Sequence, residues 1–454
     1  MRRVLIANRG EIALRIVRAC FDEGLESVVA VSAADVDSLP ARLADSVVVV
    51  GPAPAGESYL SIGRIVQAAL SSGCDALHPG YGFLSERPAL VEACEQNGIV
   101  FVGPPADTMR RSGDKLAARA IADDVGVPTG RGTAGLQDLE DAVRQAEALD
   151  RYPLLLKASA GGGGRGMTVV RSADDVRAQF QRSSAEALRA FGDGTVYLEP
   201  YIEKARHIEV QILADRHGNV VHLGERDCSA QRRYQKIIEE APSVGLPDAL
   251  VARIRDAAVR LAIALDYEGA ATCEFLVDAV HDEFVFLEIN ARVQVEHPVT
   301  EAVTGIDIVR EQLRIARGEA LSFGQADVRL HGHAIECRIN AEDPRCNFAP
   351  APGVIDEWVV PIGEGIRVDT YAERGAVVSP YYDSLVAKLI VHAADRTSAI
   401  ALMRRALDRI RTGTLVTTVD VQRAILAAPG FVDAPIWTKW LEDKFLPVYG
   451  QNAA

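Results

Sequence analysis

The sequence predicts a multidomain protein of mixed α/β and α+β class, and three observations support this. The chain of 454 residues is longer than one hydrophobic core usually allows, so we expect about three domains. Its first part alternates short apolar runs with helical patterns, which is typical of a doubly wound parallel sheet. Its middle and last parts contain strands of alternating polarity, which indicate antiparallel sheets with flanking helices.

Residues 1–112 are expected to form the parallel-sheet domain. Helices lie between several of its strands, for instance where Ile12, Ile16 and Ala19 share one face. After the first strand the chain reads ANRGEIALRI, which lacks the G-x-G-x-x-G pattern of dinucleotide-binding domains, so a nicotinamide-dependent dehydrogenase is disfavoured. Five apolar runs indicate the buried strands: 4–7, 27–32, 47–50, 75–78 and 99–103.

A glycine-rich loop connects two strands in the smaller unit that follows. The strand LLLKAS leads into Gly161–Gly164, and the strand MTVVR comes next. A Walker A loop would run from a strand into a helix, so this pattern indicates a hairpin flap instead. Consecutive glycines let backbone N–H groups converge on phosphate oxygens, and Lys157 or Lys115 could add a positive charge. A plain surface loop is the other interpretation, but the lysine on the preceding strand favours phosphate contact.

Two acidic residues are predicted to face each other in a hairpin of the central part. The strand-like runs AATCEFLVD and FVFLEIN are joined by a short polar connection centred on His281, and their phenylalanines and leucines indicate a largely buried hairpin. Symmetric folding about that residue places Glu274 opposite Glu288, with Cβ atoms about 5 Å apart. Asn290 shares the face of Glu288 because side chains alternate along a strand. These three oxygen ligands suit Mg²⁺; a solvated acidic pair, or a carboxyl group of raised pKa, is the other interpretation.

Polar residues also gather before and after this hairpin. The strand RHIEVQILA alternates, so that His207, Glu209 and Gln211 face outward together, and a solvated strand face explains them about as well as nucleotide contacts do. The segment 225–236 has more hydrogen-bonding groups than an ordinary connection, which favours a functional role. The string RVQVEHP continues the face of Glu288, and its polar side chains are expected near a reacting centre.

Composition and charge narrow the function classes. The net charge of −14 disfavours nucleic acid or anionic membranes as general partners. The seven cysteines are scattered without a C-x-x-C pair and lie mostly in apolar stretches, so buried reduced thiols are expected. No apolar run approaches the roughly 20 residues of a membrane span, and the N-terminal run is too short for a signal peptide. We therefore expect a cytoplasmic protein.

Several long strings from the whole chain point to one family. They include IANRGEIALRI, HPGYGFLSE, MRRSGDK, KASAGGGGRGM, VQVEHPVTE, ECRINAED and YYDSLVAKLI. Together they resemble biotin carboxylase, the ATP-grasp component of biotin-dependent carboxylases, and VQVEHPVTE beside ECRINAED is the most specific part of the match. The resemblance implies a Rossmann-like N-terminal domain (1–112), an ATP-grasp domain (113–330) with a glycine-loop lid at about 131–203, and a C-terminal α+β domain (331–446).

The resemblance also implies roles for individual residues. Glu274 and Glu288, with Asn290 close by, match the metal ligands, in agreement with the count along the hairpin. The residues implied to bind ATP are Lys115, Lys157, Gly162, Gly163, Gly164, Glu199, Ile202, His207, Gln231 and Tyr234. Those implied to bind bicarbonate or biotin are Lys236, Arg292, Gln294, Val295, Tyr81 and Arg338. The implied catalytic residues are Glu296, which would deprotonate bicarbonate, Lys236 and Arg292, which would hold that anion, and Arg338, which would stabilise the biotin enolate.

The implied reaction is the ATP-dependent carboxylation of biotin by bicarbonate through carboxyphosphate, the first half-reaction of an acetyl- or acyl-CoA carboxylase. It would need ATP with Mg²⁺ or Mn²⁺. The family attaches biotin to the lysine of a Met-Lys-Met signature, and this sequence has no Met-Lys pair. Biotin is therefore expected on a separate carrier protein or on a part of the chain not included. The implied partners are the biotin carboxyl carrier protein and a carboxyltransferase subunit, and the family suggests a homodimer.

Three positions depart from the family pattern. Ala160 stands where glycine is expected, Tyr234 replaces the commoner histidine, and Pro200 replaces the usual lysine beside adenine. All three affect nucleotide affinity more than chemistry. The alternatives are another ATP-grasp ligase that forms carboxyphosphate, such as a carbamoyl-phosphate synthetase half, or the biotin carboxylase component of a pyruvate- or urea-type carboxylase. A silent scaffolding subunit is disfavoured because the implied catalytic set is intact.

Overall fold

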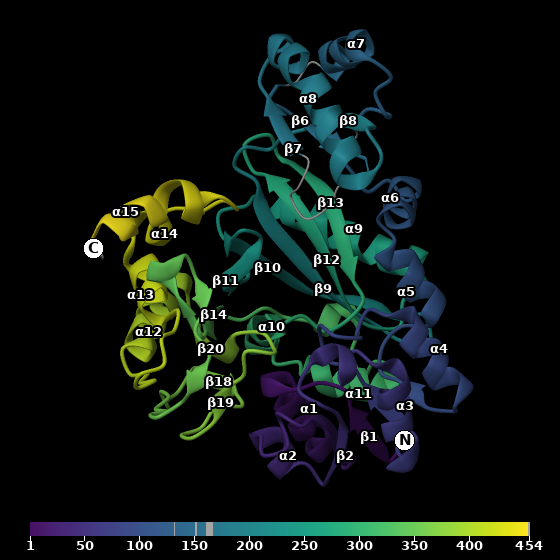
Figure 1. The fold of residues 1–454 in the computed structure, drawn as a ribbon, viewed down its shortest axis with the longest axis vertical. Helices are drawn as coiled ribbons and strands as arrows, with labels where there is room; N and C mark the ends of the chain where they lie inside the picture. Colours follow the sequence, from purple (N-terminus) through teal and green to yellow (C-terminus); the bar gives the residue numbers. More distant parts are fainter. Residues whose placement is uncertain (131, 150–151, 160–166, 453–454) are drawn as a thin grey trace.

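The N-terminal part forms a five-stranded parallel sheet covered by helices (Figure 1). The computed structural model describes residues 1–130, 132–149, 152–159 and 167–452. The strand order β3-β2-β1-β4-β5, with every neighbouring pair parallel, confirms the doubly wound prediction. The strands are β1 (Arg3–Ile6), β2 (Glu26–Ser32), β3 (Ser46–Gly51), β4 (Ala76–His78) and β5 (Val100–Phe101). The helices are α1 (Gly10–Asp22), α2 (Leu39–Leu43), α3 (Ile62–Ser71), α4 (Pro88–Gln96) and α5 (Ala106–Gly113).

A small second sheet stands apart at the top of Figure 1, with its own helices. Its antiparallel order is β7-β6-β8, so the predicted strand–loop–strand hairpin is present, while Ala160 and Gly162–Gly164 lie outside the described residues. A separate hydrophobic cluster, which includes Leu156 and Leu198, holds this unit together. Its elements are α7 (Leu139–Leu149), β6 (Leu154–Ala158), β7 (Met167–Val170), α8 (Ala173–Phe191) and β8 (Val196–Pro200), and α6 (Lys115–Asp124) precedes them.

The largest sheet has eight antiparallel strands in the order β13-β12-β9-β10-β11-β14-β20-β18. It runs without interruption from the central part into the C-terminal part, because β11 pairs with β14. Its strands are β9 (Arg206–Ala214), β10 (Val220–Arg232), β11 (Gln235–Ala241), β12 (Gly269–Asp278), β13 (Glu283–Asn290), β14 (His333–Asn340), β18 (Ile366–Thr370) and β20 (Leu385–Ala393).

Helices and short strands complete the fold around this sheet. Pro298 stands in the first turn of α10, as expected from its fixed φ angle. The helices are α9 (Asp248–Ala264), α10 (His297–Thr304), α11 (Ile308–Ala316), α12 (Arg396–Leu407), α13 (Val419–Ala427), α14 (Pro429–Val432) and α15 (Leu446–Asn452). The short strands are β15 (Glu342–Asp343), β16 (Ala349–Pro350), β17 (Gly353–Val354) and β19 (Val377–Val378).

The β12–β13 hairpin has the predicted pairing but not the predicted symmetry. Glu274 pairs with Glu288, whereas the next residue, Phe275, pairs with Phe286. Leu287 is therefore the extra residue of a β-bulge, and it is 41% exposed, so the expectation of a buried leucine there was wrong.

The thiols follow the prediction with one exception. Six of the seven cysteines are buried and free, but Cys346 is free and exposed. Among the described residues, no helix is both long and apolar enough to cross a bilayer.

Candidate active site

One cavity of about 1710 Å³ collects every described residue that the sequence assigned to the site. Its wall combines residues of the N-terminal domain, the small sheet and the large sheet, which are far apart in the sequence. The assigned residues in its wall are Tyr81, Lys115, Lys157, Glu199, Ile202, His207, Gln231, Tyr234, Lys236, Glu274, Glu288, Asn290, Arg292, Gln294, Val295, Glu296 and Arg338.

A row of charged residues crosses four neighbouring strands on one face of the large sheet. Glu209 pairs with Arg226 on one side and with Glu274 on the other, and Glu274 pairs with Glu288. Three carboxylates side by side repel one another unless cations lie among them. Arg226 supplies one such cation: its Nε lies 2.6 Å from Glu209 Oε1, and both side chains are fully buried.

Lys236 on β11 is the second cation that contacts this row. Its Nζ donates to Glu209 Oε2 at 2.5 Å, to Glu274 Oε1 at 2.9 Å and to Glu296 Oε1 at 2.6 Å. Burial disfavours its charge, but the three carboxylates outweigh burial and hold the pKa of Lys236 well above its usual range. One ammonium group thus joins the acidic row to Glu296.

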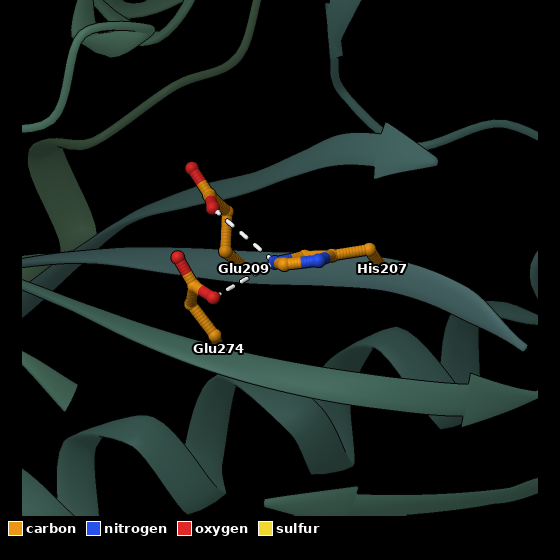
Figure 2. Close-up of side chains that lie close together, drawn as sticks. All are labelled: His207, Glu209 and Glu274. Atoms are coloured by element: carbon orange, nitrogen blue, oxygen red, sulfur yellow. Dashed lines mark ion pairs between the residues drawn. The ribbon is translucent and has the colours of Figure 1, made fainter. Parts of the chain in front are cut away.

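His207, Glu209 and Glu274 point toward one another (Figure 2). His207 Nε2 lies 3.0 Å from Glu274 Oε2 and 3.7 Å from Glu209 Oε2. Such a group of ligand atoms, all within 4.8 Å, could hold a metal ion. However, the Lys236 ammonium already contacts both carboxylates, and a second cation there would be repelled.

Glu288 fits a divalent cation better. Among the described residues it makes no hydrogen bond or ion pair, and burial followed by the charge of Glu274 raises its pKa. Asn290 Nδ2 donates to Glu274 Oε1 at 3.1 Å, so the amide lies beside both carboxylates. An uncompensated carboxylate, a second carboxylate and an amide oxygen are hard ligands of the kind that Mg²⁺ prefers.

Glu296 is held between two cations. Its Oε1 accepts from Lys236, and its Oε2 accepts from Arg338 Nη2 at 2.9 Å. Burial disfavours its charged form, but Lys236, Arg338 and Arg226 outweigh burial and hold the pKa of Glu296 well below its usual range. Glu296 is therefore ionised, and it is a weak base as long as both cations remain on it.

Arg338 is oriented by carboxylates on two sides. Its Nε donates to Glu239 Oε1 at 2.5 Å while Nη2 donates to Glu296. Glu239 faces Glu336 across the β11–β14 pair, and both are fully buried. Burial, only partly offset by Arg338, raises the pKa of Glu239 to about 7, and burial raises the pKa of Glu336 well above its usual range. These two facing carboxyl groups therefore hold a proton to higher pH than ordinary carboxyl groups do.

Arg292 closes the polar end of the hairpin. It donates to Gln294 Oε1 at 2.7 Å, to Asn290 Oδ1 at 3.1 Å and to Glu86 Oε2 at 3.1 Å. Gln294 Nε2 in turn donates to Glu274 Oε1 at 3.1 Å. The string after β13 thus returns to the acidic row, as its alternation predicted.

Residues assigned to the nucleotide lie both on the small sheet and on strands β9 and β10 of the large sheet. Lys157 on β6 forms an ion pair with Glu199 on β8, and Arg119 lies 3.0 Å from the other oxygen of Glu199. Tyr234 is 64% exposed and has a φ of +65°, which a non-glycine residue adopts only where the surrounding turn imposes it. Leu287, brought to the surface by the bulge, lines the same cavity.

The sequence did not identify several residues that complete the site. Glu209 lies on the strand face for which a solvated surface and nucleotide contacts were equally good interpretations, and its full burial excludes the solvated surface. Arg226 lay in a segment rich in hydrogen-bonding groups, but only the pairing of β9 with β10 shows its partner. Glu239 and Glu336 gave no signal beyond being acidic residues in apolar strands.

The three-domain architecture and this cavity define an ATP-grasp ligase, and comparison with known proteins names the family. Residues 1–109 match the model described as biotin carboxylase, N-terminal domain. Residues 114–323 match that of the carbamoyl-phosphate synthase L chain, ATP binding domain, and residues 336–443 match the biotin carboxylase C-terminal domain. The chain belongs to the biotin carboxylase family.

Relatives and solved structures are similar over nearly the whole chain. Biotin carboxylase of Nostoc sp. is 47% identical, covering 97% of this chain and 98% of the relative. The Campylobacter jejuni biotin carboxylase–β,γ-ATP complex has a TM-score of 0.89 at 44% identity, covering 97% and 98%. The biotin carboxylase domain of Hydrogenobacter thermophilus 2-oxoglutarate carboxylase, with MgADP, ADP and bicarbonate, has a TM-score of 0.87 at 44% identity, covering 97% of each chain.

Proposed function

We propose that this chain carboxylates biotin at the expense of ATP and bicarbonate, as the first half-reaction of a biotin-dependent carboxylase. The observation that carries the proposal is the placement of Glu296 between Lys236 and Arg338 in the cavity that also holds the Glu274–Glu288 pair. One site then contains a base, cations that can bind an anion, and oxygen ligands for a nucleotide-bound metal. Solved relatives with MgADP and bicarbonate support this assignment.

The ATP end of the site would bind and orient the nucleotide. Lys115 and Lys157 supply positive charge toward phosphate oxygens, and Glu199, Ile202, Gln231 and Tyr234 form the wall for the nucleoside. Mg²⁺, held by Glu274 and Glu288 near Asn290, would neutralise phosphate charge. The small sheet acts as a lid that excludes water from the reactive carboxyphosphate.

Glu296 acts as the base once bicarbonate arrives. Bicarbonate accepts hydrogen bonds from Lys236 and Arg292, and so draws away the Lys236 charge that keeps Glu296 weakly basic. Glu296 then removes the bicarbonate proton as a bicarbonate oxygen attacks the γ-phosphorus and ADP leaves. The substrate itself thereby raises the basicity of the group that activates it.

Arg338 acts at the biotin end. Carboxyphosphate breaks down to CO₂ and phosphate, and phosphate takes the N1′ proton of biotin. The permanently charged Arg338, oriented by Glu239 and Glu296, stabilises the negative charge on the ureido oxygen. Biotin N1′ then forms its bond to CO₂.

The proposal extends to the surroundings of the chain. Biotin is delivered by a carrier protein and passed to a carboxyltransferase subunit that selects the final acceptor, and the chain works as a homodimer. The solved Hydrogenobacter thermophilus domain, described as a dimer, supports the last point. We also assign the protein to the cytosol, on the six buried free thiols.

The test is ATP cleavage by the purified protein with free biotin. We expect ADP release that requires bicarbonate and is accelerated by biotin, and a loss of roughly 10²- to 10⁴-fold in kcat for Glu296→Gln. Carboxybiotin is trapped as ¹⁴C from labelled bicarbonate. ADP release with bicarbonate and ammonia, but without biotin, would instead identify a carbamoyl-phosphate-forming ligase.

A further inference from the structure

Lys388 on β20 is a fully buried cation that no step above uses. Its Nζ donates to the backbone carbonyl of Val295 at 2.9 Å and lies 3.0 Å from Glu11 Oε1. Asp369 on β18 lies farther away, at 3.9 Å. An ammonium group without water is costly unless several acceptors surround it, and these three come from different parts of the chain.

The two close partners of Lys388 lie next to residues that are assigned to two different substrates. Val295 lies between Gln294 and Glu296, in the segment assigned to bicarbonate. Glu11 on α1 accepts a hydrogen bond from the hydroxyl group of Tyr81, the residue assigned to the biotin ring. Both Tyr81 and Val295 line the cavity, whereas Lys388 lies behind its wall.

The position of Lys388 on the sheet is also unusual. It pairs directly with Arg338 across β14 and β20, so two cations lie side by side. Like charges opposite each other destabilise a sheet unless each has its own carboxylates. Glu239 and Glu296 compensate Arg338, and Glu11 compensates Lys388. The two cations are therefore held by carboxylates from different parts of the chain.

We propose that Lys388 is a positioning residue that fixes the biotin wall at Tyr81 relative to the bicarbonate segment at Val295. Its ammonium group joins α1 of the N-terminal domain to the segment before α10. Transfer of CO₂ between two sites requires their separation to be held within a fraction of an ångström, and a misplacement of about 1 Å can cost 10²-fold in rate. The inference rests on the proposed function.

The experiment compares Lys388→Met with Glu11→Gln in the full chain. Lys388→Met removes both links, so KM for biotin and KM for bicarbonate should each rise about fivefold or more, while KM for ATP stays within about twofold. Glu11→Gln keeps the contact to Val295, so only KM for biotin should rise. Arg396→Met is the matched control. It also removes a cation from a buried carboxylate, Glu240, but Glu240 lies on the face of β11 opposite to Glu239 and the site.

The outcomes separate this inference from the proposed function. A wild-type protein without biotin-dependent ATP cleavage refutes the function. Unchanged KM for biotin in Glu11→Gln, or the same KM changes in Arg396→Met as in Lys388→Met, overturns the positioning role in an active enzyme. If Lys388→Met does not fold, Lys388→Arg and Glu11→Gln still test the inference. An unchanged KM for bicarbonate in Lys388→Arg together with a raised KM for biotin in Glu11→Gln supports it. Any other result overturns it.

Discussion

At the scale of single residues, the site is a set of buried charges that compensate one another. Lys236 serves three carboxylates, and Arg338 serves two. Removing one member of such a set leaves another charge buried without a partner, which typically costs about 3–5 kcal/mol. Carboxyl groups that make no hydrogen bond or ion pair among the described residues are the exceptions. They allow sharper predictions, because neutralising such a group relieves a cost of burial or repulsion without breaking a contact.

Glu336 is the first of these. Both its oxygens are buried without a hydrogen-bond partner among the described residues, and burial raises its pKa well above the usual range. A raised carboxyl pKa gives stability below the usual pKa that is lost as pH rises toward the folded-state pKa, by at most about 1.4 kcal/mol per pH unit. Glu336→Gln should therefore be more stable than the wild type at pH 8.5, with a difference that shrinks toward pH 5.

Urea denaturation across that pH range measures the difference. The exposed residue Glu95, changed to Gln, is the control, because its stability curve should follow that of the wild type. Since the amide mimics a protonated carboxyl group and Arg338 keeps Glu239, the activity of Glu336→Gln should also persist. A stability difference that stays constant with pH would show that Glu336 is ionised in the folded protein.

Glu288 is the second exception, and its prediction concerns the metal. Burial and Glu274 raise the pKa of Glu288, so Glu288→Gln relieves repulsion and should raise Tm of the ligand-free protein at pH 8. The same change removes a proposed metal ligand, so stabilisation by MgADP beyond that of ADP with EDTA should disappear. Differential scanning fluorimetry measures both effects. A full Mg²⁺-dependent shift in the variant would place the metal elsewhere.

Residue patterns predicted the acidic pair but not the buried residues around it, Glu209 and Arg226. Glu274 and Glu288 are close in sequence, so counting along the hairpin was enough to place them opposite each other. Arg226 faces Glu209 only after a register shift in the β9–β10 pair, so simple counting does not place it there. Glu209 faces Glu274 across strands that are far apart in the sequence. Burial of Glu209 also looks the same in the sequence as a solvated strand face, because alternation states which residues share a face and not what covers it.

At the scale of elements, local rules predicted the strands well and their irregularities poorly. The five strands of the parallel sheet follow from apolar runs alone. The bulge at Leu287 does not, because an extra residue in a strand changes neither its polarity nor its length in a recognisable way. The prediction of the Glu274–Glu288 pair was right because pairs beyond the bulge are symmetric about residue 281, the centre that was assumed, whereas pairs nearer the turn are shifted by one residue.

The small sheet is the element that should be separable. Its hydrophobic cluster is its own, and its two ends meet where Thr133 N donates to Leu198 O at 2.8 Å. Replacing residues 133–197 by a short Gly-Ser linker should leave the rest of the protein folded, with a cooperative thermal transition, but abolish ATP binding. Calorimetric titration with MgADP measures the loss, with full-length Lys157→Met as a partial-loss control. An insoluble deletion variant would show that the sheet supports the body.

At the scale of the whole molecule, strand patterns and the family resemblance divided the chain into three parts, whereas the backbone joins the last two through one sheet. The boundary expected near residue 331 falls between β11 and β14, two strands that hydrogen-bond to each other. Arg338 of β14 then reaches Glu239 and Glu296 of the central part. The candidate site is therefore shared across the boundary, and no local pattern in the sequence indicates such pairing.

The C-terminal part should consequently be inseparable from the rest. A fragment of residues 1–330 would leave β11 as an open edge and expose Ile237 and Ile238, which pack into the C-terminal hydrophobic cluster. It would also leave Glu239 and Glu296 buried or half-buried without Arg338. We expect the 1–330 fragment to aggregate, whereas the variant that lacks residues 133–197 should stay soluble. Size-exclusion chromatography of both variants makes the comparison, and a monomeric 1–330 fragment with cooperative unfolding would mean that the central strands are stable without β14.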